Sequence, residues 1–493
     1  MRRFSSFYLT LVVLAFVFET PLISANDYSV SQTRIKRPNI ILVFIDDMGW
    51  GDFSCFGNKE VETQNIDRLA REGIRFEQFY VNSPICSPSR VAISTGQYPA
   101  RWKITSYLAH RQLNIDRGMS QWLDLKAPML ARYLQVAGYA TGHFGKWHMG
   151  GQRDVGEAPL IIEYGFDKSL TNFEGLGPRV LAIKDKFDGS KTTKHTLGSE
   201  KLGKPDEIEY VDRSLVTQSF TSAALDFIKK AEKDEKPFYV NVWPDDVHSP
   251  FFPPAARRGD GTKRKLYHGV LDTMDEQLGV LFDYVRNSKT LSDNTMILVC
   301  SDNGPEQGAG SAGPFRGHKT HLFEGGIHSS LIVWSASGVS SKAVGTVDKD
   351  SVFSAIDLVP SLLKIAGIDD KPKSGFDGEA LPDVLLGKQS GGRKKPLYFR
   401  RPPDRDKFYG IEDCPYLAIR SGQWKLLCEY DGSDVMLYDL KADPGETKNL
   451  ASKKPDLVKK MTEQLTKWHL SMPQDNGDSY VPKKRKKNKQ PRK

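Results

Sequence analysis

Hydrophobic runs and stretches of helical periodicity alternate along the chain up to residue 373. Residues 39–45 form a continuous aliphatic run, which is typical of a strand buried on both faces of a sheet. Residues 65–73 instead carry Ile66, Leu69 and Ala70 on one helical face. Further strands are expected at 74–81, 139–144, 238–243 and 296–300, and further helices at 128–137, 215–231 and 267–285. This alternation predicts an α/β fold, with a mostly parallel sheet sandwiched by helices.

The pattern changes after residue 373, where connections rich in proline and glycine separate short strand-like runs. These runs lie at 397–400, 416–420, 424–429 and 436–440. A following stretch at 455–470 places Leu457, Met461, Leu465 and Trp468 on one helical face. We therefore expect a smaller C-terminal antiparallel sheet packed with a helix. The predicted units are a main α/β domain at 36–390, a C-terminal subdomain at 391–475 and a tail at 476–493.

The N-terminus is typical of a signal peptide at residues 1–25. Arg2 and Arg3 precede an apolar run at 7–18, and the small residues Ser24 and Ala25 precede the expected cleavage point. The run is shorter than the roughly 20 residues that cross a bilayer, so we expect no integral membrane segment in the mature chain. The protein should therefore be exported to a periplasmic, secreted or lumenal location, with an uncleaved N-terminal anchor as the alternative.

The charge of the chain is concentrated at its C-terminal end. The formal net charge is +9, but residues 483–493 alone carry eight basic side chains and no acid, so the folded part is close to neutral. Such a block of like charges repels itself and is expected to be solvated and disordered. A contact of this tail with polyanions is the alternative. The overall composition, 39% hydrophobic and 27% charged, excludes a wholly disordered chain, and no nucleic-acid partner is expected.

Five cysteines are present, an odd number that leaves at least one unpaired. Cys414 and Cys428 flank a strand-like segment, and whether they form a disulfide stays open because spacing alone does not establish geometry. The sequence has no cysteine and histidine cluster with zinc spacing. A metal ion would therefore need oxygen ligands.

Polar side chains follow four of the predicted strands directly. They are Asp46, Asp47, Lys146, His148, His248, Asp302 and Asn303. Sites in parallel sheets form at the carboxyl ends of strands, so these side chains should converge if their strands are neighbours. Each feature alone is more often a solvated turn or a structural histidine, and it is their joint occurrence that indicates a site. The acids and the amide suit a hard divalent cation, calcium with magnesium as the alternative.

Six segments, taken in order, identify a family. They are Asp46 to Asp52, Cys86 to Gly96, Gly145 to His148, Ser301 to Gly304, Lys319 with Glu324-Gly325-Gly326, and Leu437 to Leu440 with Asp443 to Leu450. In this order they resemble the type I sulfatases, the arylsulfatase and N-acetylgalactosamine-6-sulfatase group of the alkaline phosphatase superfamily. The resemblance covers nearly the whole mature chain and implies an alkaline-phosphatase-like sheet.

The resemblance also implies a chemistry. Cys86 would be oxidised to formylglycine by a formylglycine-generating maturation enzyme, and the aldehyde hydrate would attack a sulfate ester and later release inorganic sulfate. The implied substrate is a sulfated carbohydrate or another sulfated small molecule. By family position the catalytic residues are Cys86, Arg90, Lys146, His148, His248 and Lys319, and the metal ligands are Asp46, Asp47, Cys86, Asp302 and Asn303.

The residue types fit these roles. Negative charge rises on the bridging oxygen as the S–O bond breaks, and Arg90, Lys146 and Lys319 are cations that would stabilise it. Proton transfers near neutral pH are tasks for histidines. The segment after Glu324-Gly-Gly departs from the family, since His328 stands in a region where relatives commonly carry an arginine. We expect this departure to alter packing rather than the chemistry.

Two other functions stay open. A phosphonate or phosphate ester hydrolase of the same superfamily would use the same fold and metal, although Lys146, His148, His248 and Lys319 together favour sulfate. A non-catalytic protein that binds sulfated glycans is the second alternative.

Overall fold

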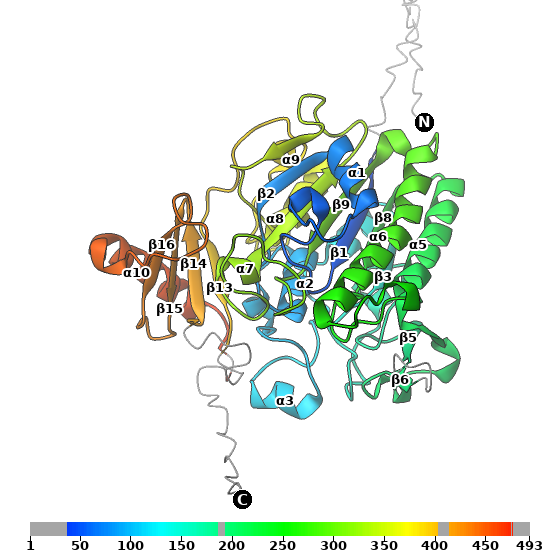
Figure 1. Cartoon of the computed structure of the whole chain (residues 1–493), viewed down its shortest axis with the longest axis horizontal. Coiled ribbons are helices and arrows are strands. Elements are labelled where there is room, and N and C mark those ends of the chain that lie inside the picture. The colour runs from blue at the N-terminus through cyan, green and yellow to red at the C-terminus, as the bar shows by residue number, and fades with distance from the viewer. Residues whose placement is uncertain (1–36, 186–192, 403–413, 475, 477–493) are drawn as a thin grey trace, which may run out of the picture. The chain divides into compact units, whose positions relative to one another are not determined.

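The central element of the structure is a nine-stranded sheet. The computed structural model describes residues 37–185, 193–402, 414–474 and 476. The strands lie in the order β11-β2-β10-β9-β1-β8-β3-β4, and β12 pairs with β2. Figure 1 labels β2, β9, β1, β8 and β3 of this sheet. Their bounds are β1 Asn39–Ile45, β2 Ile74–Tyr80, β3 Ala140–Gly145, β4 Lys168–Leu170, β8 Phe238–Trp243, β9 Thr295–Ser301, β10 His328–Trp334, β11 Thr346–Asp348 and β12 Phe353–Ser354.

The middle of this sheet is parallel, as the sequence predicted. β1 lies between β8 and β9 and pairs in parallel with both, and β3 continues the parallel pairing beyond β8. β10 is the exception, because it runs antiparallel to β2 and to β9. The sequence did not reveal β10, since its first residues are His328, Ser329 and Ser330 and interrupt the apolar pattern, although the strand is fully buried.

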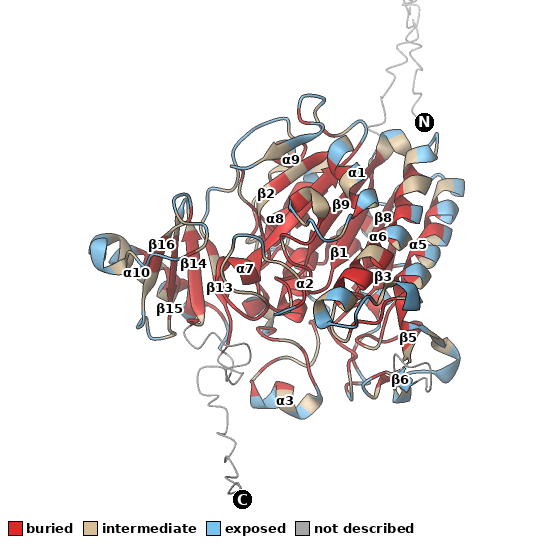
Figure 2. Ribbon diagram, viewed as in Figure 1, coloured by how far each residue is buried: buried red, intermediate tan, exposed pale blue. Residues whose placement is uncertain are grey.

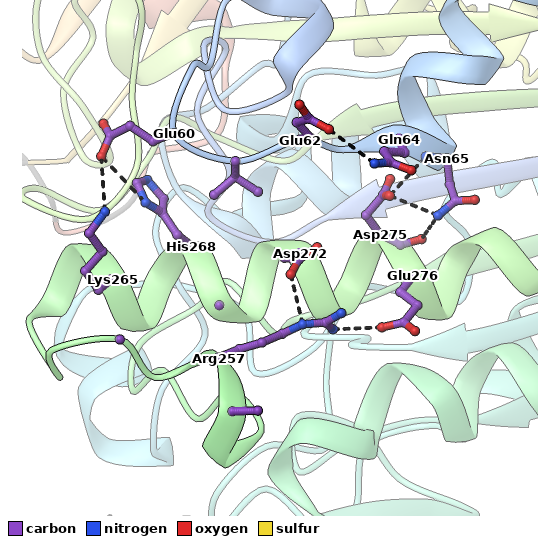
Figure 3. A pocket seen from close by; sticks show the side chains of 14 residues that line it. Glu60, Glu62, Gln64, Asn65, Arg257, Lys265, His268, Asp272, Asp275 and Glu276 are labelled. Atoms are coloured by element: carbon purple, nitrogen blue, oxygen red, sulfur yellow. Dashed lines mark hydrogen bonds and ion pairs between the residues drawn. The ribbon is translucent and has the colours of Figure 1, made fainter.

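Helices cover both faces of the sheet. Alternate side chains of β1 enter two different cores, with Ile40 and Leu42 in one and Ile41 and Val43 in the other, as the two-residue repeat of a strand requires. The first core is covered by α2 Cys86–Thr95, α4 Leu130–Val136 and α8 Ala355–Ile365. The second is covered by α1 Gln64–Glu72, α5 Val216–Lys233 and α6 Lys263–Asn287. Figure 2 shows the buried strands between partly exposed α5 and α6 and the helices of the other face.

Three short helices and a small sheet lie in the connections. The helices are α3 Arg111–Asp116, α7 Glu324–Ile327 and α9 Pro382–Leu385. The small sheet has the order β6-β5-β7 and consists of β5 Arg179–Lys184, β6 Thr193–His195 and β7 Ile208–Asp212. The sequence did not predict this sheet, because β6 and β7 are short and lie largely at the surface, so they carry no apolar run.

The C-terminal sheet is antiparallel and has four strands in sequence order, as predicted. Its elements are β13 Leu397–Arg400, β14 Leu417–Ser421, β15 Trp424–Cys428, β16 Met436–Asp439 and the helix α10 Pro455–Ser471. Met461 and Leu465 of α10 are buried against it in a third core, which also contains Phe323 and Ile327 from the main fold. The domain boundary at residue 390 stays a prediction.

The remaining predictions concern the cysteines, a membrane segment and the two ends of the chain. Each cysteine lies in the described part of the chain and is a free thiol there, so Cys414 and Cys428 are not joined. Among the described residues, no helix combines the length and the apolar character needed to cross a membrane. The predicted signal peptide and most of the basic tail lie outside the described residues.

A buried charge cluster joins the C-terminal sheet to the main fold. Lys425 of β15 is fully buried, and its Nζ lies 2.9 Å from Oε1 of Glu324 and 2.9 Å from Oε1 of Glu446. The other oxygen of Glu324 accepts a hydrogen bond of 2.6 Å from the Tyr80 hydroxyl and lies 3.1 Å from Nδ1 of His328. We call Lys425, Glu324 and Glu446 the Lys425 cluster. Because buried charges are stable only when paired, this cluster fixes α7 to β15.

His328, where the sequence departs from the family pattern, packs against aromatic side chains. Its ring is stacked between Tyr80 and Phe315, with ring centroids 4.6 Å and 4.2 Å away. Its Nε2 faces the backbone oxygen of Glu77 and its Nδ1 faces Glu324. A flat polar ring therefore fills this place beside the Lys425 cluster.

Replacing Lys425 by methionine should destabilise the protein by about 3–5 kcal/mol, because two buried carboxylates would lose their shared cation. The measurement is the free energy of unfolding in urea. The matched control is Lys459→Met, which removes a lysine from an exposed position of α10 and should leave the stability nearly unchanged. Equal stability of the two variants would contradict this account of the cluster.

Candidate active site

Four neighbouring parallel strands end at the same edge of the large sheet. In the sheet order β9-β1-β8-β3, each strand is followed by polar residues that the sequence singled out. Asp302 and Asn303 follow β9, Asp46 and Asp47 follow β1, His248 lies in the loop after β8, and Lys146 and His148 follow β3. The parallel order therefore brings together side chains that are as many as 257 positions apart in the sequence.

The acidic residues form one buried cluster. Carboxylate oxygens of Asp46, Asp47 and Asp302 lie within 4.8 Å of one another, and all three side chains are fully buried. Asn303 donates from Nδ2 to Oδ1 of Asp47 at 2.8 Å. Its buried Oδ1 has no hydrogen-bond partner among the described residues. Three carboxylates and an amide oxygen without a partner are the ligands that a hard divalent cation takes, so these residues could hold a metal ion.

The pKa values of the carboxyls reflect this crowding. Burial raises the pKa of the Asp302 carboxyl well above its usual range, and the charge of Asp46 raises it further. Burial also opposes ionisation of Asp46, but Lys146 and Arg90 outweigh it and hold the pKa of Asp46 well below its usual range. A cation bound between the acids would favour the ionised form of all of them.

Arg90 is a buried guanidinium that bridges two acids. Its Nη2 lies 2.8 Å from Oδ2 of Asp302 and 3.1 Å from Oδ1 of Asp46, and its Nη1 donates to the Lys146 backbone oxygen at 2.7 Å. The guanidinium carbon also lies 5.3 Å from the ring centroid of Trp243. Because so many contacts fix it, Arg90 is a preorganised positive charge.

The two lysines each pair with one acid. Nζ of Lys146 lies 2.6 Å from Oδ2 of Asp46, and Nζ of Lys319 pairs with Oδ2 of Asp47. Burial disfavours both ammonium groups, but Asp46 raises the pKa of Lys146 and Asp47 raises that of Lys319, so both pKa values lie above the usual range. Both lysines are therefore cations in this site.

Cys86 is the first residue of α2. Its Sγ and the ligand atoms of Asp46 and His248 lie within 4.8 Å of one another. Burial raises the pKa of the Cys86 thiol above its usual range. Since only the thiolate is a good nucleophile, an unmodified Cys86 is poorly suited to attack a substrate.

The two histidines have different surroundings. His148 is buried, its Nε2 lies 2.9 Å from the backbone oxygen of Leu108, and burial lowers its pKa to about 3. A carbonyl oxygen only accepts, so we assign the proton of neutral His148 to Nε2. His248 is one-third exposed, with Nδ1 2.7 Å from the Ser249 backbone oxygen and Nε2 3.5 Å from Oδ2 of Asp47. Its Nε2 is therefore the nitrogen that faces the acidic cluster.

Two glycines permit close backbone contacts in the site, one between the ends of β3 and β8 and one between the loop after β9 and α7. Gly145 has a φ of 134°, and a Cβ there would lie 2.2 Å from the Trp243 backbone oxygen. A Cβ on Gly304 would lie 1.9 Å from the backbone oxygen of Gly325. The first contact lets Lys146 turn toward Asp46, and the second holds the Lys319 segment against the end of β9.

One residue of the site was missed at the sequence level. Oε2 of the buried Glu174 lies 3.0 Å from Nζ of Lys146 and 3.2 Å from Nδ1 of His148. Glu174 also accepts a backbone hydrogen bond of 2.8 Å from the amide of His148. It stands outside all six segments, in a loop without a recognisable pattern, so only the fold reveals its place.

Comparisons with known proteins show the family of the chain. The sulfatase family model matches residues 38–368, and a model of the C-terminal part of N-sulphoglucosamine sulphohydrolase matches residues 317–471. N-acetylgalactosamine-6-sulfatase of Rattus norvegicus is 30% identical over 439 residues, covering 83% of this chain and 81% of the relative. N-acetylgalactosamine-6-O-sulfatase of Bacteroides thetaiotaomicron is 28% identical and covers 87% of this chain and 93% of the relative.

Solved structures share the fold. A crystal structure of Ps i-CgsB in complex with k-i-k-neocarrahexaose has a TM-score of 0.73 and 24% identity, covering 90% of this chain and 95% of the other. Phosphonate monoester hydrolase of Agrobacterium radiobacter has a TM-score of 0.60 and 19% identity, covering 90% and 97%. These likenesses show the fold alone. Since the sulfatase model matches more than half of the chain, the protein belongs to the sulfatase family and is a sulfuric ester hydrolase.

Proposed function

We propose that this protein releases inorganic sulfate from a sulfated carbohydrate, with Cys86 converted to formylglycine beside a calcium ion. The observation that carries the proposal is the approach of Cys86, Asp46 and His248, whose ligand atoms lie within 4.8 Å of one another. This position is the N-terminus of a buried helix, which favours anions.

Formylglycine would supply the nucleophile that an unmodified Cys86 lacks at this buried position. Burial keeps the thiol protonated, so the chain lacks a thiolate nucleophile there, whereas the hydrated aldehyde supplies a hydroxyl nucleophile. A formylglycine-generating enzyme would be the maturation partner. The conversion is expected before the chain folds, because Cys86 is 3% exposed in the folded protein.

Asp46, Asp47, Asp302 and Asn303 are the proposed protein ligands of the metal ion, with the modified Cys86 as a further ligand. Calcium takes about six to eight oxygen ligands, more than these residues supply, so substrate oxygens can complete its shell. Magnesium is the alternative. The ion would polarise the sulfate oxygens and the nucleophile.

The basic residues have separate tasks in this proposal. Arg90 holds Asp46 and Asp302 in place and keeps a fixed positive charge at the helix N-terminus. Lys146 and Lys319 neutralise the sulfate group and the oxygen that leaves it. The Ser249 backbone oxygen accepts from Nδ1 of His248, so Nε2 is the nitrogen directed toward the departing alcohol, and it can give that alcohol a proton when the ring is an imidazolium. His148, with its proton at Nε2, is free to accept a proton at Nδ1.

A sulfated carbohydrate is the proposed substrate class. It is supported by the relatives, whose names specify sulfated N-acetylgalactosamine. Export through a signal peptide at 1–25 and contact of the tail at 476–493 with polyanions are further proposals, which agree with an extracellular glycan substrate. A phosphonate ester hydrolase is the second candidate, because such an enzyme shares the fold. A protein that only binds glycans would have no need of the aldehyde.

Replacing Cys86 by alanine should abolish sulfate ester hydrolysis, because the nucleophile cannot form. The assay is release of 4-nitrophenol and of sulfate from 4-nitrophenyl sulfate. In the wild type, the tryptic peptide of residues 76–90 should be about 18 mass units lighter than its thiol form. The control is Cys428→Ala in β15, which should stay active. Activity that survives in Cys86→Ala would disprove the mechanism.

Removal of divalent cations should lower the melting temperature and abolish activity, because the buried acids would repel one another. Calcium at about 100 times its dissociation constant should stabilise the protein by about 2.7 kcal/mol. The measurement is thermal unfolding after chelation, with calcium or magnesium added back. Asp302→Asn should lose this response, and exposed Asp206→Asn should keep it. A melting temperature independent of both cations would contradict the proposed metal site.

Sulfate esters should be hydrolysed faster than phosphate or phosphonate esters with the same leaving group. The reasons are the match to the sulfatase family and the set Lys146, His148, His248 and Lys319, which favours sulfate. The measurement compares kcat/KM for 4-nitrophenyl sulfate, 4-nitrophenyl phosphate and 4-nitrophenyl phenylphosphonate. Preference for either phosphorus ester would favour the second candidate function.

A further inference from the structure

Glu174 places one carboxylate oxygen between two groups of the proposed catalytic set. Its Oε2 lies 3.0 Å from Nζ of Lys146 and 3.2 Å from Nδ1 of His148. Only 4% of Glu174 is exposed. Although burial opposes ionisation, His148 and Lys146 lower the pKa of Glu174 to about 2, so it carries a negative charge at neutral pH.

Glu174 is itself held by a chain of hydrogen bonds. Its backbone amide donates to Oδ1 of Asn172 at 2.9 Å, and Nδ2 of Asn172 donates to Oδ2 of Asp245 at 2.9 Å. Asp245 pairs with Arg213 at 3.1 Å, and its backbone oxygen accepts from the amide of His248 at 3.1 Å. The loop of Glu174 is therefore tied to the loop of His248.

Glu174 offsets the positive charges that surround His148. Among the described residues, the largest charge effects on His148 come from the acid Glu174 and from the cations Lys146 and Arg90. Burial and both cations oppose a proton on this imidazole. The backbone oxygen of Leu108 engages Nε2, so a proton that arrives must sit at Nδ1, beside Oε2 of Glu174.

We propose that Glu174 is a positioning residue for the reaction. It fixes the Lys146 ammonium and the His148 imidazole relative to each other, and it stabilises the positive charge when His148 takes a proton at Nδ1. The proton moves from a hydroxyl of the nucleophile to His148 and later returns to solvent, while Glu174 stays ionised. The inference rests on the proposed function, because it needs His148 to act as a base.

The test compares Glu174→Gln, which keeps the shape but removes the charge, with Glu174→Asp, which keeps the charge. With 4-nitrophenyl sulfate, Glu174→Gln should lower kcat by about 10²-fold with little change in KM. Glu174→Asp should retain more of kcat than Glu174→Gln does. The control is Glu62→Gln, an exposed acid, which should behave as the wild type.

A binding measurement adds a readout that does not depend on turnover. In the Cys86→Ala background, Glu174→Gln should leave the dissociation constant for inorganic sulfate unchanged or lower, because a nearby negative charge is removed. Only a small fall in melting temperature is expected, because Lys146 keeps Asp46 as its partner when Glu174 loses its charge.

Three results would overturn the inference. One is a kcat for Glu174→Gln within about twofold of the wild type. Another is a parallel rise of KM and of the sulfate dissociation constant, which would mean that Glu174 only maintains the shape of the pocket. The third is equal loss of kcat in Glu174→Asp and Glu174→Gln. Inactivity of the wild type itself would instead contradict the proposed function.

Discussion

The structure depends on the balance of buried charges at one edge of the large sheet. Burying Asp46, Asp47 and Asp302 together would be strongly unfavourable unless each acid met a cation. Arg90 bridges Asp46 and Asp302. Lys146 pairs with Asp46 and Lys319 pairs with Asp47, so the acids and bases fix one another. A divalent cation fits the same balance, since it would sit where the carboxylates meet. The groups of the site are thus preorganised by mutual attraction, before any substrate enters.

The C-terminal sheet takes part in this arrangement through the Lys425 cluster. Glu324 lies five residues after Lys319 in the sequence, and its backbone amide donates to Glu446 at 2.6 Å. Arg316, three residues before Lys319, donates to the Glu446 backbone oxygen at 3.2 Å. The segment that carries Lys319 is therefore held at both ends by Glu446, in the loop that follows β16. This gives a physical reason for the segment at Asp443 to Glu446, whose Glu446 makes both contacts.

The sequence predicted the parts of the fold and the site that depend on local pattern. β1 and β9 are continuous apolar runs, so they and the polar residues after them were evident. β10 and β5 to β7 were missed because their burial or pairing comes from tertiary contacts rather than from apolar periodicity. Glu174 was missed for a related reason, since a single glutamate in a loop has no local signature. The free thiols of Cys414 and Cys428 likewise follow from geometry, which spacing leaves open.

Three of the nine non-glycine residues that have a positive φ in the described part of the chain belong to the site or lie beside it. Asp47, His148 and Thr320 have positive φ values of 58°, 51° and 79°, a region that non-glycine residues rarely adopt. Each lies in the site or beside a residue of it, and hydrogen bonds hold each backbone in place: Asp47 to Asp302 at 3.1 Å, His148 to Glu174 at 2.8 Å and Thr320 to the Pro84 backbone at 2.9 Å. Strained residues persist only where the surroundings over-determine them. The contact of Thr320 with Pro84 joins the Lys319 segment to the loop before Cys86. The positive φ of Thr320 therefore helps to hold Lys319 near Cys86.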